Sequence, residues 1–242
     1  PEPMKTKQLH TDTLGLAYTS YFEGNDKAYF TLLSPHFDPD DVEVAHFFRN
    51  FNAMPPIEQR AIEECKGRIL DVGAGTGTHS LELQKRGFQV TALDISPLAC
   101  AIMSKRGISK VVCEDFYTHA YTTYHTILFL MNGIGIVGTL EGFPQFFESL
   151  SRILEPGGQV LVDSSDLRYL FEEDDGSFAI PLCGYYGELE YTVEFEQYTS
   201  QPFPWVYVDF DTLASAAESA GWNCTLVAVG EHYDFLARLT RK

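Results

Sequence analysis

The sequence predicts an α/β fold: a doubly wound, mostly parallel, seven-stranded sheet with an antiparallel last strand and helices on both faces. Three observations indicate it. Short apolar runs alternate with helical segments between residues 67 and 163. Several of the helical segments end at a glycine, such as Gly87 and Gly107, which is typical of a helix stop. Over residues 188–198 polar and apolar residues alternate singly, as in a half-exposed antiparallel strand. Strands that alternate with helices form a parallel sheet between two helical layers.

The elements of this core follow in order from residue 67. Apolar runs predict strands over residues 68–72, 89–93, 110–113, 126–131 and 159–163. Helices are expected between them over residues 78–86, 96–106 and 143–154. The chain is expected to close with a helix over residues 212–220, capped by Asp209 or Asp211, and with strands over residues 223–229 and 235–240.

Residues 1–64 are expected to form an N-terminal cap segment. The core is expected to span residues 65–242 and to contain a β-ribbon insertion at about 165–208. Pro56 predicts the start of a short helix over 57–62, and the sequence Pro-His-Phe-Asp-Pro-Asp-Asp at 35–41 predicts a loop. Residues 188–198 and 205–208 are expected to pair as the ribbon. The cap and the insertion are dense in aromatic residues, and we expect them to close a small-molecule pocket together. These aromatic residues include Tyr18, Tyr21, Phe48, Tyr185, Tyr186 and Trp205.

Composition and charge exclude several classes of protein. The chain has 242 residues, 45% of them apolar, and its 34 acidic and 17 basic residues give a formal charge of −17. Because phosphate binding depends on clustered Lys and Arg, neither a nucleic acid nor a membrane is expected as a partner. Five cysteines without CxxC spacing favour reduced thiols over a disulfide frame or a metal site. With no long apolar run and no secretory signal, a cytoplasmic monomer or homodimer is expected.

A glycine-rich turn follows the first core strand, in the sequence Leu-Asp-Val-Gly-Ala-Gly-Thr-Gly at residues 70–77. Glycines at such a turn let the backbone approach a ligand, and the following helix offers unpaired N–H groups. Asp94 ends the next strand, 23 residues after Asp71, where a carboxylate can accept hydrogen bonds from a ribose diol. A dinucleotide fold shares these features, but its fingerprint is GxGxxG, and this chain has GxGxG with Thr78 in the last place.

These motifs resemble those of the class I S-adenosylmethionine-dependent methyltransferases. The resemblance includes the glycine turn, the acidic end of the second strand at Asp94 and the acidic-aromatic pair Asp115-Phe116. It continues with Asn132-Gly133 after the fourth strand and with Pro156-Gly157-Gly158 before the fifth, and it covers about residues 66–166. The resemblance implies S-adenosylmethionine as cofactor and methyl transfer to a small-molecule nucleophile (O, N or C) by in-line displacement at the sulfonium.

The resemblance also implies roles for individual residues. The glycine turn would pass under the methionine part of the cofactor, with Asp71 steering it or meeting the ammonium. Asp94 would hold the ribose hydroxyls, Ile95 would pack on the adenine, Asp115 would accept from its N6 amino group and the Phe116 N–H would meet a ring nitrogen. The residues expected to bind the cofactor are Asp71, Gly73, Ala74, Gly75, Thr76, Gly77, Asp94, Ile95, Asp115, Phe116, Asn132, Gly133 and Arg49. Asn132 and Gly133 would border the sulfonium. Arg49 would bind the methionine carboxylate, with a surface salt bridge as the alternative.

No strong catalytic group stands out, because alignment of the nucleophile with the sulfonium is the main requirement. Asp163, Asp166 and Tyr186 are the weak candidates, and His79 is expected to pack against the cofactor or to be a polar group on the helix surface. Residues 163–211 contain twelve acidic side chains and one basic one, Arg168. An acidic mouth favours a neutral or cationic substrate, although a solvated acidic face is the alternative.

Other functions stay open at this point. The chain can be a catalytically silent protein that binds S-adenosylmethionine or a nucleotide, or an aminopropyl transferase on the same fold. An NAD-dependent oxidoreductase is opposed by the glycine spacing.

Overall fold

The computed structural model describes residues 8–171 and 184–242 and contains two sheets. The larger has seven strands in the order β12-β13-β8-β7-β4-β5-β6. Their bounds are β4 (Arg68–Val72), β5 (Gln89–Asp94), β6 (Val111–Cys113), β7 (Tyr124–Phe129), β8 (Leu154–Ser165), β12 (Trp222–Val229) and β13 (Asp234–Arg241). Strand β13 runs antiparallel to both of its neighbours, and β6-β5-β4-β7-β8 are parallel. The predicted fold class is therefore confirmed.

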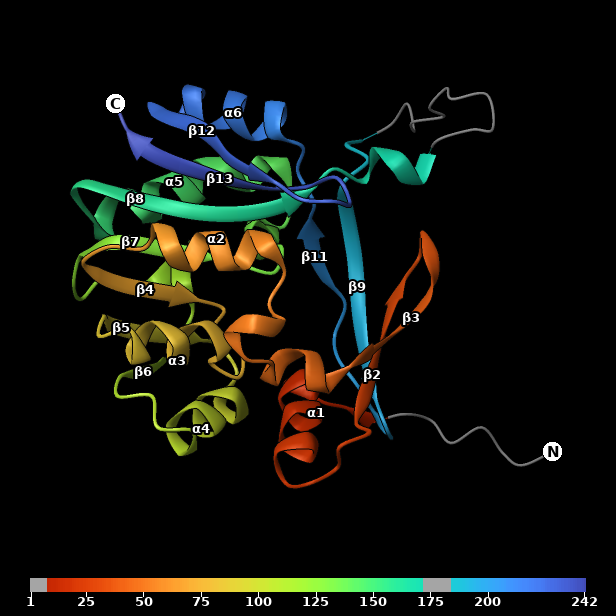
Figure 1. The fold of residues 1–242 in the computed structure, drawn as a ribbon. Coiled ribbons are helices and arrows are strands. Elements are labelled where there is room, and N and C mark those ends of the chain that lie inside the picture. Colours follow the sequence, from red (N-terminus) through yellow and green to blue (C-terminus); the bar gives the residue numbers. More distant parts are fainter. Residues whose placement is uncertain (1–7, 172–183) are drawn as a thin grey trace.

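Helices cover both faces of this sheet (Figure 1). They are α2 (Pro56–Glu64), α3 (Thr78–Lys85), α4 (Pro97–Lys105), α5 (Phe143–Ile153) and α6 (Phe210–Ser219). Alternate residues of β4 point to opposite faces, as strand geometry requires. Ile69 packs with residues of α2 and α3, whereas Leu70 packs with residues of α5 and α6.

The second sheet combines the N-terminal segment with the insertion. Its strands are β1 (Gln8–Leu9), β2 (Tyr29–Ser34), β3 (Phe37–Glu43), β9 (Glu188–Phe195), β10 (Tyr198–Thr199) and β11 (Phe203–Val206). Strand β9 pairs with β2 on one side and with β10 and β11, so segments some 160 residues apart in sequence share one sheet. Helix α1 (Thr13–Phe22) packs between this sheet and α4, and Figure 1 shows β9, β2 and α1 beside the core.

Short 3-10 helices complete the described chain. They are η1 (Val44–Phe48), η2 (Phe51–Ala53), η3 (Phe116–Thr118), η4 (Gly133–Val137), η5 (Leu140–Gly142) and η6 (Leu167–Phe171). Asp209, one of the two expected caps, accepts a hydrogen bond from the Thr212 N–H at the start of α6.

Some local expectations were wrong. The strand expected over residues 188–198 ends at Phe195, and the chain turns at Glu196, whose φ angle is 50°. Residues 35–41 were expected to be a loop, but Phe37–Glu43 forms β3, an edge strand whose one partner among the described strands is β2. An edge strand tolerates Pro39 and exposed carboxylates, since its outer backbone groups need no ladder partner. The fourth core strand ends at Phe129 rather than at residue 131, because Met131 and Asn132 have positive φ angles of 63° and 55°.

The described residues test other sequence-based expectations only in part. Helix α2 belongs by sequence to the expected cap over residues 1–64, yet it packs on Ile69 and Leu83 of the core, and the division at residue 64 stays a prediction. Cys183 and residues 172–183 of the insertion lie outside the described residues. Within the described chain, no helix is long and apolar enough to cross a membrane, and no cluster of three potential metal-binding side chains occurs.

Candidate functional site

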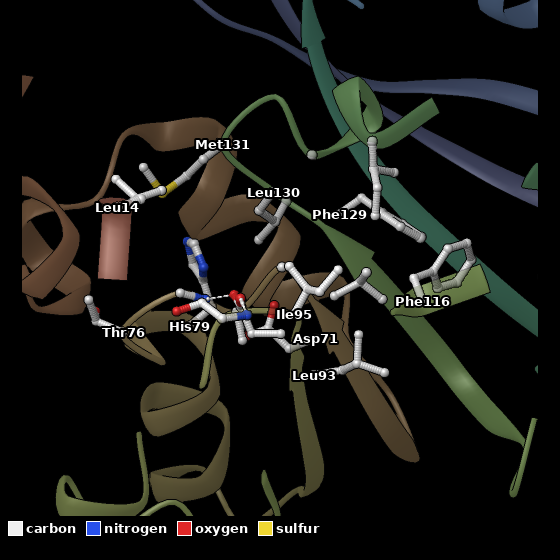
Figure 2. A pocket seen from close by; sticks show the side chains of 18 of the residues that line it. Leu14, Asp71, Thr76, His79, Leu93, Ile95, Phe116, Phe129, Leu130 and Met131 are labelled. Atoms are coloured by element: carbon white, nitrogen blue, oxygen red, sulfur yellow. Dashed lines mark hydrogen bonds between the residues drawn. The ribbon is translucent and has the colours of Figure 1, made fainter. Parts of the chain in front are cut away.

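A cavity of about 500 Å³ opens at the carboxyl ends of the parallel strands. It lies where the strand order reverses, between β4 and β7, which is the usual ligand crevice of an open α/β sheet. The residues that line it come from the strand ends of the core, from the N-terminal segment and from the insertion, and Figure 2 shows several of their side chains. They include Leu14, Tyr18, Phe47, Asp71, Thr76, His79, Asp94, Ile95, Glu114, Asp115, Phe116, Met131, Gly133 and Trp205.

The glycine turn forms the floor of this cavity. Gly73, Gly75 and Gly77 have φ angles of 66°, 57° and 81°, in the left-handed region that favours glycine. A Cβ on Gly77 would also overlap Ile108, so close packing as well as the backbone angle requires glycine there. Alternate left-handed residues at the end of β4 thus account for the GxGxG spacing.

Asp94 holds the glycine turn through its carboxylate. Its Oδ2 accepts a hydrogen bond from the Gly75 N–H at 2.7 Å, and its Oδ1 accepts from the Ser96 N–H at 2.9 Å. Burial raises the pKa of Asp94, although these two N–H groups act in the opposite direction. Each oxygen keeps a lone pair for a further donor, so the carboxylate can accept hydrogen bonds from a diol in the cavity.

Asp71 lies below the turn and is buried. Its Oδ2 accepts a hydrogen bond from the Ser80 hydroxyl at 2.6 Å. Burial raises the pKa of the Asp71 carboxyl, while the charge of His79 and the Ser80 hydroxyl lower it.

His79, Glu58 and Arg49 form a buried charged cluster beside Asp71. The Nε2 of His79 lies 2.6 Å from Oε2 of Glu58, and the Arg49 guanidinium forms an ion pair with the same carboxylate. The side chains of Arg49 and Glu58 are each only 6% exposed. Burial tends to raise the pKa of Glu58, but the contacts with His79 and Arg49 bring it below its ordinary value.

Arg49 does not line the cavity, although the sequence predicted that it meets a cofactor carboxylate. Its partner is a buried carboxylate rather than one of the surface acids considered from the sequence. Glu58 was missed altogether, yet a signal existed. Glu58 stands four residues before Ile62 and three before Ala61, so it belongs to the apolar face of α2.

Residues after β6 line the opposite wall of the cavity. Asp115 accepts a hydrogen bond from the Tyr117 N–H at 2.8 Å and thereby caps η3, and Phe116 is buried beside it. Ile95, from the end of β5, lines the cavity although 69% of its side chain is exposed. Four expected cofactor residues from two strand ends are thus brought together with the glycine turn: Asp94, Ile95, Asp115 and Phe116.

The turn after β7 is held by Asp163. Its carboxylate accepts hydrogen bonds from the Met131 N–H at 2.9 Å and the Gly133 N–H at 3.3 Å. Asn132, between them, donates from Nδ2 to the Val206 carbonyl at 3.3 Å. Burial and the charge of Glu58 raise the pKa of Asp163 to about 7.

The other two catalytic candidates lie apart from the cavity lining. The Tyr186 hydroxyl donates to Asp166 Oδ1 at 2.7 Å, and Asp166 also pairs with Arg168. Asp163 is likewise absent from the cavity lining and reaches it only through the Met131–Gly133 backbone. A catalytic role for Asp163, Asp166 or Tyr186 stays a prediction.

The N-terminal segment and the insertion cover the cavity. The Phe47 carbonyl accepts hydrogen bonds from the hydroxyls of Thr76 and Thr78, which ties the N-terminal segment to the glycine turn. Trp205, from β11, packs directly on Gly135, where a Cβ would overlap its indole ring. Of the six aromatic residues expected to close the pocket, Tyr18 and Trp205 line it.

Comparison with known proteins assigns this arrangement to a family. A family model described as a methyltransferase domain matches residues 69–158. The crystal structure of an S-adenosylmethionine-dependent methyltransferase from Bacteroides fragilis, in complex with S-adenosyl-L-homocysteine, is 40% identical to the chain. It has a TM-score of 0.90, and the alignment covers 98% of each chain. The chain belongs to the S-adenosylmethionine-dependent methyltransferases. Its cofactor is S-adenosylmethionine, as the sequence predicted.

Other relatives match this methyltransferase over a shorter part. The putative methyltransferase YqeM of Bacillus subtilis is 28% identical over 104 residues, and EEF1A lysine methyltransferase 2 of Mus musculus is 31% identical over 109 residues. These matches cover 40% of this chain and 42% and 45% of the relatives, less than half of their length. CalS10 of Micromonospora echinaspora has a TM-score of 0.51 at 20% identity, over 76% of this chain and 86% of CalS10, and shares the fold.

The lining of the methyltransferase cavity fits its cofactor. S-adenosylmethionine carries a positive sulfonium, a positive ammonium, a ribose diol and one carboxylate. The cavity offers four carboxylates, from Asp71, Asp94, Glu114 and Asp115, and the first two lie at or next to the carboxyl ends of the adjacent strands β4 and β5. Apolar side chains such as Ile95 and Phe116 provide surfaces for a planar ring.

Proposed function

We propose that this methyltransferase transfers the methyl group of S-adenosylmethionine to a neutral or cationic small-molecule nucleophile. The observation that carries the proposal is the make-up of one cavity. Carboxylates at Asp71 and Asp94 line one part of it, and apolar side chains at Leu14, Phe47 and Trp205 line another. A volume of about 500 Å³ is within the range of small-molecule sites.

In this proposal, the glycine turn and Asp94 hold the ribose and methionine parts of the cofactor. Left-handed Gly73, Gly75 and Gly77 keep side chains away from the ligand. The Asp94 oxygens accept from the ribose hydroxyls while they hold the Gly75 and Ser96 N–H groups.

The adenine is proposed to lie between Ile95 and Phe116. Asp115 then accepts from the exocyclic amino group, and the Phe116 N–H donates to a ring nitrogen. The turn at Asn132 and Gly133 borders the methyl-bearing end. Support for this placement comes from the common cavity that Ile95, Asp115, Phe116 and Gly133 line.

The chemistry of the proposed reaction rests on alignment. S-adenosylmethionine supplies a methyl group that its sulfonium already activates for displacement. The protein must hold the acceptor in line and exclude water, which can contribute roughly 7–11 kcal/mol to a barrier. Tyr18, Phe47 and Trp205, from the N-terminal segment and the insertion, also line the cavity, and we propose that they exclude water from the acceptor. An acceptor that arrives unprotonated needs no base.

The charge of the cavity favours a neutral or cationic acceptor. Four carboxylates concentrate a negative field in a space with apolar walls. Among proteins of this fold, CalS10 is described as an amino pentose methyltransferase and MtfA as a glycopeptide N-methyltransferase. At 20% and 15% identity these are likenesses of fold, so the proposed preference for an amine or a neutral acceptor depends on the carboxylates.

Two measurements test the proposal. Calorimetric titration with S-adenosylhomocysteine is expected to show one site per chain. A methyl-transfer screen over amines, phenols, carboxylates, thiols and a lysine peptide, followed by S-adenosylhomocysteine release, is expected to give turnover with a small amine or neutral acceptor. Binding without turnover on any acceptor would favour a catalytically silent binding protein. Turnover of decarboxylated S-adenosylmethionine with release of methylthioadenosine would indicate aminopropyl transfer instead.

A further inference from the structure

The negative charge of the cavity disfavours the carboxylate at the methionine end of the cofactor. Four carboxylates line the cavity, yet the methionine end of S-adenosylmethionine carries a carboxylate of its own. A carboxylate that enters a negative, partly buried site needs a cation or several donors close to it. Among the described residues that line the cavity, His79 is the only side chain able to carry a positive charge.

The two nearby guanidinium groups have partners within the protein, although the buried Nε of Arg49 has none among the described residues. Arg49 pairs with Glu58 and donates to the His46 carbonyl. Arg106 donates to the Thr76 carbonyl at 2.7 Å and lies over the Phe48 ring. Neither lines the cavity. A ligand that recruited Arg49 would leave the buried Glu58 carboxylate with less compensation, which is costly.

His79 lines the cavity, and a contact with Glu58 fixes its ring. It is the second residue of α3, it is buried, and Figure 2 shows its ring among the side chains that line the cavity. Its Nε2 lies 2.6 Å from Glu58 Oε2, so one ring nitrogen is already bound. Its Nδ1 has no hydrogen-bond partner among the described residues and remains available. Burial lowers the pKa of His79, but the Glu58 contact and the charge of Asp71 outweigh this and raise the pKa above its ordinary value.

We infer that His79, oriented by Glu58, binds the methionine carboxylate of the cofactor through Nδ1–H. This inference rests on the proposed cofactor site and replaces Arg49 as the carboxylate-binding residue. The Arg49–Glu58 pair then has a positioning role: it fixes the carboxylate that holds the imidazole ring. His79 also stands at the N-terminus of α3, where the helix dipole favours an anion.

Several charged groups surround His79 and decide its protonation. They are Glu58 from α2, Asp71 from β4, Asp163 from β8, and Arg49 and His46 from the N-terminal segment. Glu58 and Asp71 favour the imidazolium, and Arg49 opposes it. The contact with a ligand carboxylate is therefore expected to weaken as the pH rises through the raised pKa of His79.

A pair of ligands isolates this contact. S-adenosylhomocysteine carries the methionine carboxylate, whereas 5′-methylthioadenosine has the same adenosine and sulfur without the amino-acid end. Both are titrated calorimetrically into the wild-type protein, into His79→Gln and into His79→Asn. Gln reaches the position of Nε2 and can keep the Glu58 contact. Asn reaches that of Nδ1 and can keep a neutral donor toward the ligand. His36→Gln, on an exposed turn, is the matched control.

We expect His79→Gln to weaken S-adenosylhomocysteine binding by about ten- to a hundredfold, as for loss of a hydrogen bond to a charged group. Binding of methylthioadenosine should stay within twofold, and His79→Asn should lie between wild type and His79→Gln. In the wild type only the first ligand should bind more weakly as the pH rises. Equal effects of His79→Gln on both ligands, or none, would overturn the inference and leave the cofactor site intact. Failure of the wild type to bind either ligand would overturn the cofactor site itself.

Discussion

Asp94 offers the sharpest test of the cofactor site, because its carboxylate joins the glycine turn to the proposed ribose position. Its two oxygens accept from the Gly75 and Ser96 N–H groups at 2.7 and 2.9 Å. Asp94→Ala removes both backbone contacts and the proposed diol contacts together. A hydrogen bond to a charged group contributes about 1.5–3 kcal/mol, so the variant should lose roughly tenfold or more in cofactor affinity and also melt at a lower temperature.

Asp94→Asn is the milder change. The amide keeps the volume and one acceptor oxygen, so one backbone N–H and one diol hydroxyl retain their acceptor, and the other of each loses it. We expect this variant to stay folded and to bind S-adenosylhomocysteine about tenfold more weakly, which corresponds to about 1.4 kcal/mol. Calorimetric titration measures the affinity, a thermal melt reports folding, and Asp26→Asn on the exposed surface is the matched control. A folded Asn variant with wild-type affinity would refute the role of Asp94.

Three further outcomes follow from the structure. Gly77→Ala should destabilise the fold and weaken cofactor binding far more than Gly87→Ala, because both glycines have positive φ angles but only at Gly77 would a Cβ overlap a neighbour. Equal melting temperatures of the two variants would contradict this expectation. Burial raises the pKa of Asp163 to about 7, so the folded state binds its proton more tightly than the unfolded state does, and stability due to this group is lost as the pH rises from about 4 to about 7. Asp163→Asn should lack this pH-dependent loss in the free energy of unfolding, which amounts to up to roughly 4 kcal/mol. If urea unfolding shows the same pH dependence in the variant and the wild type, the expectation is wrong. NADP should not bind at micromolar concentrations, because the described residues that line the cavity include Asp94 and no Lys or Arg that can receive a 2′-phosphate. Calorimetry with NADP checks this.

The core and the cofactor motifs could be predicted from the sequence because they depend on local signals. Strand β4 occupies the predicted residues 68–72, and α4, capped by Ser96, begins within one residue of the predicted start. Parallel strands bring their carboxyl ends to one edge, so Asp71, Asp94 and Asp115 had to converge once the strands were assigned correctly. The glycine spacing reports three left-handed backbone angles, which few other residues adopt.

The surroundings of the site were decided by contacts between distant segments. Strand β2 finds its partner β9 about 160 residues later, and for that reason the acidic segment at residues 35–41 becomes part of an edge strand rather than a loop. Whether a tyrosine such as Tyr186 faces a cavity or binds Asp166 depends on a packing arrangement that no local pattern encodes.

The sequence by itself determined the family, the parallel core and the position of the cofactor turn, since each depends on residue types at fixed spacing along the chain. Only the tertiary structure decided which groups the side chains of Arg49 and His79 contact. Arg49 and His79 are separated by 30 positions in sequence, and both meet Glu58, a carboxylate on the apolar face of a third segment. Burying one carboxylate requires nearby positive charge, so that requirement holds Arg49 outside the cavity and fixes the His79 ring on its wall.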